Sequence, residues 1–203
     1  MISTCEVNKK AYSQIAKAYH ENTKNLSMKW QQEIFSQMLG NQGSILDLMC
    51  GTGRDAKYFS QQGFDVTGVD NVKEMVSIAK QYAPKAEFIT QDVLELKLAK
   101  EFDGVWCNAG IFMLPKFKNE EFLEIAHQHL KPQGILYLSF KVGKYEYFFQ
   151  DKRYEVKRFE AHYQPEEIKE LTKELFSFEL EMNTNENNDY RQKPMIDMFF
   201  RKK

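Results

Sequence analysis

The chain has 203 residues, of which 28 are Lys or Arg and 29 are Asp or Glu, so its formal net charge is −1 at pH 7. Because this balance excludes the strongly basic surface of most nucleic-acid-binding domains, we do not expect a nucleic-acid partner. No apolar stretch approaches the roughly 20 residues of a membrane-spanning helix, and the N-terminus does not resemble a secretory signal, so we expect no membrane association and a cytoplasmic location.

The N-terminal 43 residues predict a helical cap. Apolar side chains recur there at the spacing of one helix face, with a break near residues 22–27. These side chains are Ile15, Ala16, Tyr19, Trp30, Ile34, Phe35 and Met38. Gly40 and Gly43 then end the helical pattern. We expect residues 1–43 to cover a core that begins at residue 44.

Residues 44–141 alternate between short apolar runs and amphipathic stretches. The strands are expected at Ile45–Met49, Phe64–Val69, Ala86–Thr90, Phe102–Cys107 and Ile135–Phe140. The helices are expected at Asp55–Gln62, Val72–Tyr82 and Asn119–Leu130. Such alternation is typical of an α/β fold, a doubly wound and mostly parallel sheet with helices on both faces.

The C-terminal third adds an insertion and a closing segment to the same single domain, residues 1–203. Residues 142–163 are rich in aromatic side chains and predict an inserted hairpin with its turn at Gln150–Lys152. In residues 164–203, proline at the first helical position predicts a helix from Pro165 to about Phe176. Strands at Phe178–Met182 and Met195–Phe200 would then form an edge hairpin around the polar loop Asn183–Lys193, with Arg201, Lys202 and Lys203 protecting its edge.

The first expected strand runs into a glycine turn and then a helix. Gly51, Gly53 and Ala56 satisfy the pattern G-x-G-x-x-A, which is found in dinucleotide-binding folds, so a dinucleotide ligand is one interpretation. However, Asp47 precedes the turn and Asp55 lies in the first turn of the following helix. Carboxylates at these positions would repel a pyrophosphate, and they favour a cationic ligand instead.

Two further acids end the next two strands. Asp70 ends the second strand, and Asp92 follows the third. Ligands of open parallel sheets bind outside the carboxyl ends of the strands, where these carboxylates would meet. S-adenosylmethionine fits this pattern because it is a cation without phosphate, and a carboxylate such as that of Asp70 can accept both of its ribose hydroxyls. Asp92 could accept from the adenine amino group.

The stretch from Ile45 to Lys80, ILDLMCGTGRDAKYFSQQGFDVTGVDNVKEMVSIAK, resembles the first motifs of class I S-adenosylmethionine-dependent methyltransferases. FITQDVLEL, FDGVWCNAGIFMLP and LKPQGILYLSFK resemble the later motifs of that family. The resemblance implies a Rossmann-like sheet of seven strands, mostly parallel, whose last strand is antiparallel. It implies that residues 44–141 are the cofactor-binding core, and that S-adenosyl-L-homocysteine is the product.

The resemblance also implies which residues bind the cofactor. Asp47, Gly51 and Gly53 would surround the methionine moiety, Asp70 would bind the ribose, and Asn108 would lie near the methyl group. The full predicted set is Asp47, Met49, Cys50, Gly51, Gly53, Asp70, Asn71, Val72, Met75, Asp92, Val93 and Asn108. One departure is Met49, where the family usually has glycine, and its side chain would narrow the cleft.

Methyl transfer by in-line displacement requires alignment and desolvation, and it needs a base only when the acceptor must lose a proton. Candidate catalytic residues are Asn108, Tyr19, His162 and Tyr163, although surface or packing roles are equally compatible with the sequence. Lys141 is a further candidate. Related chains often have histidine at the position of Met113. Because this chain has methionine there, it lacks the most obvious candidate for a general base.

These features predict an S-adenosylmethionine-dependent methyltransferase that acts on a small-molecule acceptor. A dinucleotide-dependent oxidoreductase and a non-catalytic S-adenosylmethionine-binding module remain alternatives. Three widely spaced cysteines and four histidines match neither a disulfide framework nor a zinc-binding spacing, so we expect no metal. A monomer or weak homodimer is expected.

Overall fold

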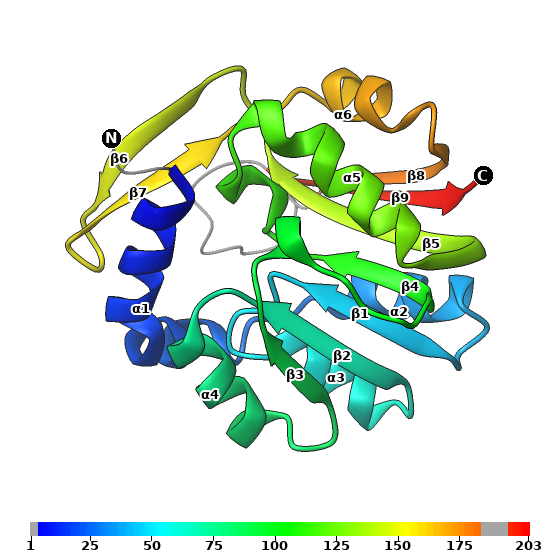
Figure 1. The fold of residues 1–203 in the computed structure, drawn as a ribbon, viewed down its shortest axis with the longest axis horizontal. Coiled ribbons are helices and arrows are strands. Elements are labelled where there is room, and N and C mark those ends of the chain that lie inside the picture. Colours follow the sequence, from blue (N-terminus) through cyan, green and yellow to red (C-terminus); the bar gives the residue numbers. More distant parts are fainter. Residues whose placement is uncertain (1–3, 184–194) are drawn as a thin grey trace.

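A computed structural model describes residues 4–183 and 195–203 (Figure 1). Its centre is a seven-stranded sheet in the order β3-β2-β1-β4-β5-β9-β8. The strands are β1 (Ser44–Leu48), β2 (Asp65–Asp70), β3 (Glu87–Thr90), β4 (Phe102–Cys107), β5 (Leu130–Lys141), β8 (Phe176–Asn183) and β9 (Met195–Lys202). A separate pair, β6 (Glu146–Asp151) and β7 (Val156–Ala161), forms the inserted hairpin.

The directions of the strands confirm the fold that the sequence predicts. Strands β1 to β5 are parallel to one another, with Leu46 of β1 opposite both Thr67 of β2 and Val105 of β4. The last strand, β9, lies between β5 and β8 and is antiparallel to both. The sheet is therefore a Rossmann-like arrangement with one reversed strand.

Helices cover both faces of the sheet. On one face, α2 (Lys29–Met38), α3 (Arg54–Gln61) and α4 (Lys73–Tyr82) bury a cluster that includes Phe35, Phe59, Trp106 and Tyr137. The rings of Trp106 and Tyr137 stack there at 3.7 Å between centroids. On the other face, α5 (Asn119–Gln128) and α6 (Pro165–Thr172) pack against the apolar side chains of β1, β4 and β5. Short 3₁₀ helices at Val93–Glu95, Ile111–Met113 and Lys116–Lys118 follow β3 and β4.

The N-terminal helix α1 (Thr4–Thr23) and the β6–β7 hairpin form a cap beside the sheet (Figure 1). Asn8 joins the two parts, because its amide donates to the Phe159 carbonyl at 3.0 Å and accepts from the Phe159 N–H at 2.8 Å. The same amide donates to the Met113 carbonyl at 3.1 Å. A side chain that mimics a strand partner in this way fixes α1 against the hairpin and against the segment that follows β4.

Three details of the predicted C-terminal third are wrong. The helix from Pro165 ends at Thr172 and not near Phe176, because Phe176 begins β8 opposite Lys202. The turn of the inserted hairpin lies at residues 152–155, after Asp151 ends β6. The cationic C-terminus does not protect a sheet edge: β9 is an interior strand, and Lys202 donates to main-chain carbonyls near the end of α5. Most of the predicted Asn183–Lys193 loop lies outside the described residues.

Within residues 4–183 and 195–203, no helix combines the length and the apolar character that crossing a membrane requires. The helices instead have one face that packs against the sheet or the cap and another that meets solvent.

Phe35 offers a direct test of the core between α2 and the sheet. Its ring is 0% exposed and lies 5.1 Å from the Trp106 ring, so we expect Phe35→Ala to lower the free energy of unfolding by about 3–5 kcal/mol. Trp30, on the same helix but 68% exposed, is the matched control, and Trp30→Ala should change stability by less than about 0.5 kcal/mol. Urea unfolding followed by circular dichroism measures both values, and equal losses would contradict the assignment.

Candidate functional site

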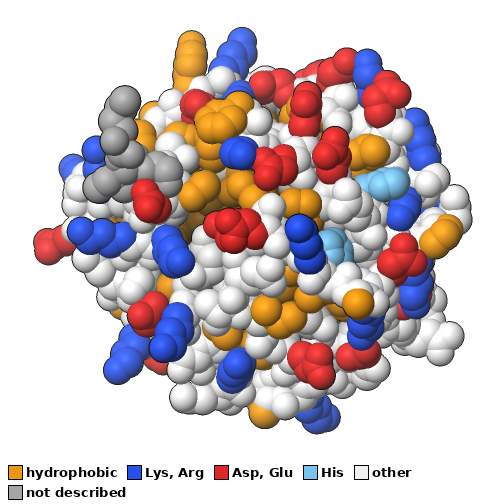
Figure 2. Space-filling model, in the orientation of Figure 1, with side chains coloured by type: hydrophobic (Ala, Val, Ile, Leu, Met, Phe, Trp, Pro, Cys, Tyr) orange, Lys and Arg blue, Asp and Glu red, His pale blue; other side chains and the backbone are white. Residues whose placement is uncertain are grey.

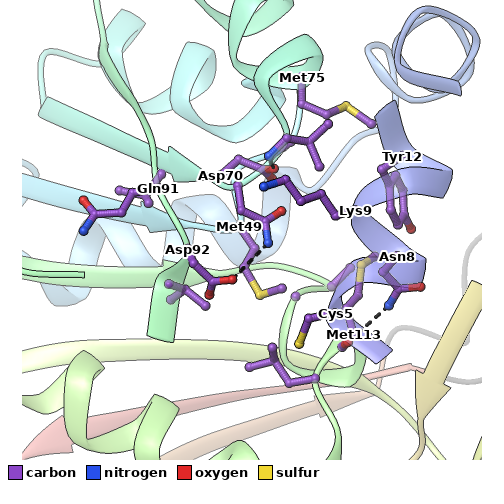
Figure 3. Close-up of a pocket in the computed structure, with 18 of the residues that line it drawn as sticks. Cys5, Asn8, Lys9, Tyr12, Met49, Asp70, Met75, Gln91, Asp92 and Met113 are labelled. Carbon is purple, nitrogen blue, oxygen red and sulfur yellow. Dashed lines mark hydrogen bonds between the residues drawn. The ribbon is translucent and has the colours of Figure 1, made fainter. Parts of the chain in front are cut away.

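Three adjoining cavities lie where β1, β2, β3 and β4 end. The strand-end cavity, of about 80 Å³, lies between the ends of β2 to β4 and helix α1 (Figure 3). The loop cavity, of about 40 Å³, lies against the glycine turn and Asp55. The cap cavity, of about 500 Å³, lies between α1, the β6–β7 hairpin and the end of β5. Tyr19 lines all three, so the cavities adjoin one another around this side chain.

The turn between β1 and α3 has an unusual backbone. Met49, Gly51 and Gly53 all have positive φ angles, of 56°, 55° and 79°. For a residue with a side chain this conformation costs about 1–2 kcal/mol, so Met49 adopts a glycine-like backbone at an energetic cost. Its side chain lines both the strand-end and the loop cavities, where the sequence predicts a narrowed cleft.

Gly53 has a different role from Gly51. A Cβ atom at Gly53 would lie 3.0 Å from the Cβ of Ala79 and 3.1 Å from the Phe88 ring. Gly53 is thus required for close packing of the turn on α4 and β3, and it is not among the residues that line the three cavities. Gly51 lines the strand-end and loop cavities, as the sequence predicts for a ligand-binding glycine.

Asp70 is held by two backbone groups. The Gly51 N–H donates to one carboxylate oxygen and the Val72 N–H to the other, both at 2.9 Å. Each oxygen keeps a further lone pair for a ligand, and Asp70 lines the strand-end cavity (Figure 3). Burial raises the pKa of Asp70 to about 6, although the two N–H donors lower it. A hydroxyl-bearing ligand that donates to both oxygens would stabilise the ionised form.

Asp92 and its neighbours form the far wall of the strand-end cavity. The Leu94 N–H donates to one Asp92 oxygen at 3.0 Å and the Asn71 amide to the other at 3.3 Å. Apolar side chains line the cavity on either side of Asp92 and Asn71. Together with Asn71, they are residues that the sequence predicts to bind the cofactor. The apolar residues are Val72, Met75 and Val93.

Asp47 and Asp55 form a buried acidic pair at the loop cavity. Burial, together with the nearby charge of Asp55, raises the pKa of Asp47 well above its usual value. Its Oδ2 atom is buried and has no hydrogen-bond partner among the described residues. An ammonium group in the loop cavity would reduce the cost of ionising Asp47. Cys50 lines the same cavity.

Asp55 is not the open carboxylate that the sequence suggests. Its oxygens accept from Gln32 at 2.9 Å, from Arg54 at 2.9 and 3.0 Å, from Trp106 at 3.1 Å and from Asn108 at 2.9 Å. Burial raises its pKa, but Arg54 and these hydrogen bonds outweigh burial, and the pKa is lowered. Asp55 therefore organises the site, and Arg54 balances its charge.

The four predicted catalytic candidates separate into two pairs. Asn108 lines the strand-end and loop cavities, and Tyr19 lines all three. Tyr163 is fully buried with its hydroxyl 3.1 Å from the Asn119 amide, which is a packing role. His162 does not line these cavities, and its Nε2 lies 3.2 Å from both Glu160 and Tyr147. Neither Tyr163 nor His162 lines the three cavities, and His162 lies behind Tyr147 and Glu160, which line the cap cavity.

The sequence-based candidates include Tyr19 of α1 but not the residues nearer the start of this helix. Cys5, Asn8, Lys9 and Tyr12 come from this helix and line the strand-end cavity opposite Asp70 and Asp92 (Figure 3). These residues and Tyr19, two turns further on, are spaced as one face of a helix. This spacing is the pattern from which the sequence could have predicted that they line one surface. No group of three or more His, Cys, Asp or Glu side chains suited to a metal ion occurs among the residues that the structure describes.

Known sequences match the segment that builds this site. The profile of the family described as "Methyltransferase domain" matches residues 45–134. The chain is 32% identical over 143 residues to a putative methyltransferase YqeM from Bacillus subtilis, covering 66% of this chain and 58% of that protein. It is 33% identical over 100 residues to a ubiquinone biosynthesis O-methyltransferase from Rickettsia canadensis, covering 47% of this chain and 41% of that protein. The chain thus spans about half the length of these curated relatives.

A solved structure shares the fold. The 1,6-didemethyltoxoflavin-N1-methyltransferase from Burkholderia thailandensis, with its substrate and S-adenosylhomocysteine bound, superposes with a TM-score of 0.74. It is 22% identical and covers 95% of this chain, with 84% of its own chain matched, so it supports the fold alone. Residues 45–134 thus match a methyltransferase domain, and in its curated relatives and its fold the chain is similar to class I S-adenosylmethionine-dependent methyltransferases.

Proposed function

We propose that this chain binds S-adenosylmethionine in the strand-end and loop cavities and transfers its methyl group to a small molecule in the cap cavity. One observation carries the proposal: the strand-end and cap cavities share Tyr12, Tyr19, Ala109 and Met113 as common walls. A methyl donor in the strand-end cavity and a methyl acceptor in the cap cavity would meet at these residues. One of the relatives named above is a ubiquinone biosynthesis O-methyltransferase, which supports a small-molecule acceptor.

The residues of the two smaller cavities fit the parts of the cofactor. The Asp70 oxygens would accept the two ribose hydroxyls, and Val72, Met75 and Val93 would flank the adenine beside Asp92. The methionine end would lie along Gly51 in the loop cavity, with its ammonium near the unpartnered Asp47 oxygen. The cofactor supplies an electrophilic methyl group, so this chain needs to orient the donor and exclude water.

Asn108 is not a general base, because a neutral amide takes up no proton near neutral pH, but its side chain is fixed at both ends. Its amide nitrogen donates to Asp55 at 2.9 Å, and its oxygen accepts from the Ser139 hydroxyl at 2.8 Å. A side chain fixed at both ends can shape the wall next to the reacting atoms, and we propose that positioning role for Asn108. Tyr19, which lines all three cavities, would close the path between donor and solvent.

The size of the cap cavity supports a small molecule as the acceptor. Its volume of about 500 Å³ lies within the range of sites for small ligands, roughly 300–1,000 Å³. With a balanced overall charge, a nucleic-acid acceptor is disfavoured. We also propose that the chain acts in the cytoplasm as a monomer or weak homodimer.

The cofactor and turnover can be tested together. We expect isothermal titration to detect binding of S-adenosylmethionine and S-adenosylhomocysteine but not of NADH, because no dinucleotide phosphate would be stabilised beside Asp47 and Asp55. Methyl-labelled S-adenosylmethionine with a pool of small metabolites should then yield a labelled product. Binding of NADH alone would favour an oxidoreductase, and binding without any transfer would favour a non-catalytic module.

Asp70→Asn tests the ribose contact. Loss of hydrogen bonds to a charged carboxylate costs about 1.5–3 kcal/mol, so we expect roughly 10- to 100-fold weaker binding of S-adenosylhomocysteine. Asp65→Asn, at the exposed start of the same strand, is the control and should leave binding unchanged. Similar affinities for the two variants in isothermal titration would remove Asp70 from the site.

Binding should also depend on pH through Asp70. Its pKa of about 6 means that the carboxylate is ionised at pH 7.5 and largely protonated at pH 5.5. Because ribose hydroxyls bind the ionised form better, affinity for S-adenosylhomocysteine should fall about fourfold over this interval as pH decreases. Titrations at both pH values measure the change. Asp70→Asn should be insensitive to it, and an equal loss in that variant would assign the effect to another group.

A further inference from the structure

The cap cavity has the opposite charge to the two cavities beside it. The cationic residues that line it are Lys141, Lys152, Arg153 and Arg158, and the acidic ones are Asp151 and Glu160. The acidic residues that line the strand-end and loop cavities are Asp47, Asp55, Asp70 and Asp92, and the cationic ones are Lys9 and Arg54. Positive charge in a partly enclosed cavity raises the local concentration of anions, so the two halves of the site favour ligands of opposite sign.

Arg158 is the buried centre of the positive charge. The residue is 5% exposed, its Nη2 lies 2.6 Å from Asp151, and its Nη1 donates to the Tyr12 hydroxyl at 2.6 Å. Its Nε–H is buried and has no hydrogen-bond acceptor within the described part of the chain. The guanidinium group is therefore fixed in place, while its Nε–H donor is not used by the described residues.

The carboxylates that line the cavity do not balance its cations. Asp151 serves two guanidinium groups, since Arg153 lies 3.2 Å from the same oxygen that pairs with Arg158. Glu160 pairs with Lys141 and is more distant from Arg158, at 3.8 Å. Among the described residues of this wall, a net positive charge therefore remains, and Lys152 adds to it. An anion that enters the cavity would be stabilised by this excess.

Aromatic rings surround the same guanidinium group. The Arg158 guanidinium carbon lies 5.3 Å from the ring centroids of both Tyr12 and Phe149. Tyr147 and Tyr154 also line the cavity. Figure 2 shows a hollow left of centre with hydrophobic side chains in its walls and charged side chains of both signs around it. A flat ring could stack on these walls while a substituent reaches the cations.

We propose that the methyl acceptor is a small molecule that combines an aromatic ring with an anionic group such as a carboxylate. Arg158 and Arg153 bind the anion, and the rings of Tyr12 and Phe149 flank the aromatic body. This inference rests on the proposed function, in which the cap cavity holds the acceptor. It goes beyond that function because it assigns the acceptor a charge and names the residues that select it.

Three probes with the same phenol ring test the charge preference. 4-Hydroxybenzoate is anionic, 4-hydroxybenzamide is neutral and tyramine is cationic. Titrated into protein saturated with S-adenosylhomocysteine, 4-hydroxybenzoate should bind about tenfold more tightly than 4-hydroxybenzamide, and tyramine should bind most weakly. Equal affinities, a preference for tyramine, or no binding of any probe at millimolar concentration would overturn the inference. Failure of S-adenosylhomocysteine itself to bind would instead overturn the proposed function.

Variants assign the preference to residues. Arg158→Gln should abolish the tenfold preference for the anion, and Arg158→Lys should restore part of it. Because Arg158 also joins the cap to α1, Arg153→Gln is the second test: its side chain is 54% exposed, so the fold should tolerate the change and the preference should fall several-fold. Lys157→Gln is the matched control, because Lys157 is exposed on β7, the strand that carries Arg158, and does not line the cavity. A preference that survives in both arginine variants, or that is lost equally in Lys157→Gln, would overturn the assignment.

Discussion

The buried carboxylate of Asp55 holds the site together. Its donors come from α2 through Gln32, from α3 through Arg54, and from β4 and the segment after it through Trp106 and Asn108. A buried carboxylate is stable only when such donors satisfy it, and each donor would in turn lose its partner without it. The start of α3, the central strand β4 and helix α2 are thus fixed relative to one another by one side chain. The position of Asn108 at the wall of two cavities follows from this network.

The near-neutral total charge hides a separation of charge in space. Acidic side chains gather where β1, β2 and β3 end, whereas the cap contributes cations from β5, β7 and the hairpin turn. The acids differ in their tendency to ionise. The pKa of Asp70 is about 6, Arg54 keeps the pKa of Asp55 low, and burial raises the pKa of Asp47 and so favours its protonated form. A ligand that is cationic at one end and flanked by hydroxyls would shift these groups towards their ionised forms.

Most of the core could be predicted because its signals are local. The strand Phe102–Cys107 is predicted to the residue, since a short apolar run bounded by polar residues needs no distant information. The end of the helix at Thr172 could not be predicted, because Phe176 is helical by pattern and joins β8 only by pairing with β9. For the same reason, the cations at residues 201–203 look like an exposed edge in sequence, whereas Arg201 and Lys202 lie in an interior strand of the sheet.

The sequence by itself determined the order of strands and helices, the glycine turn after β1, and the presence of acids at successive strand ends. Each of these depends on residues close together along the chain. Only the tertiary structure decided which side chains surround the cap cavity, since Tyr12 and Arg158 meet across 146 residues. It also decided that Tyr163 is a core residue and that the Asp55 carboxylate accepts hydrogen bonds from several separate elements. Contacts of this kind arise when separately formed elements pack together, and no local pattern records them.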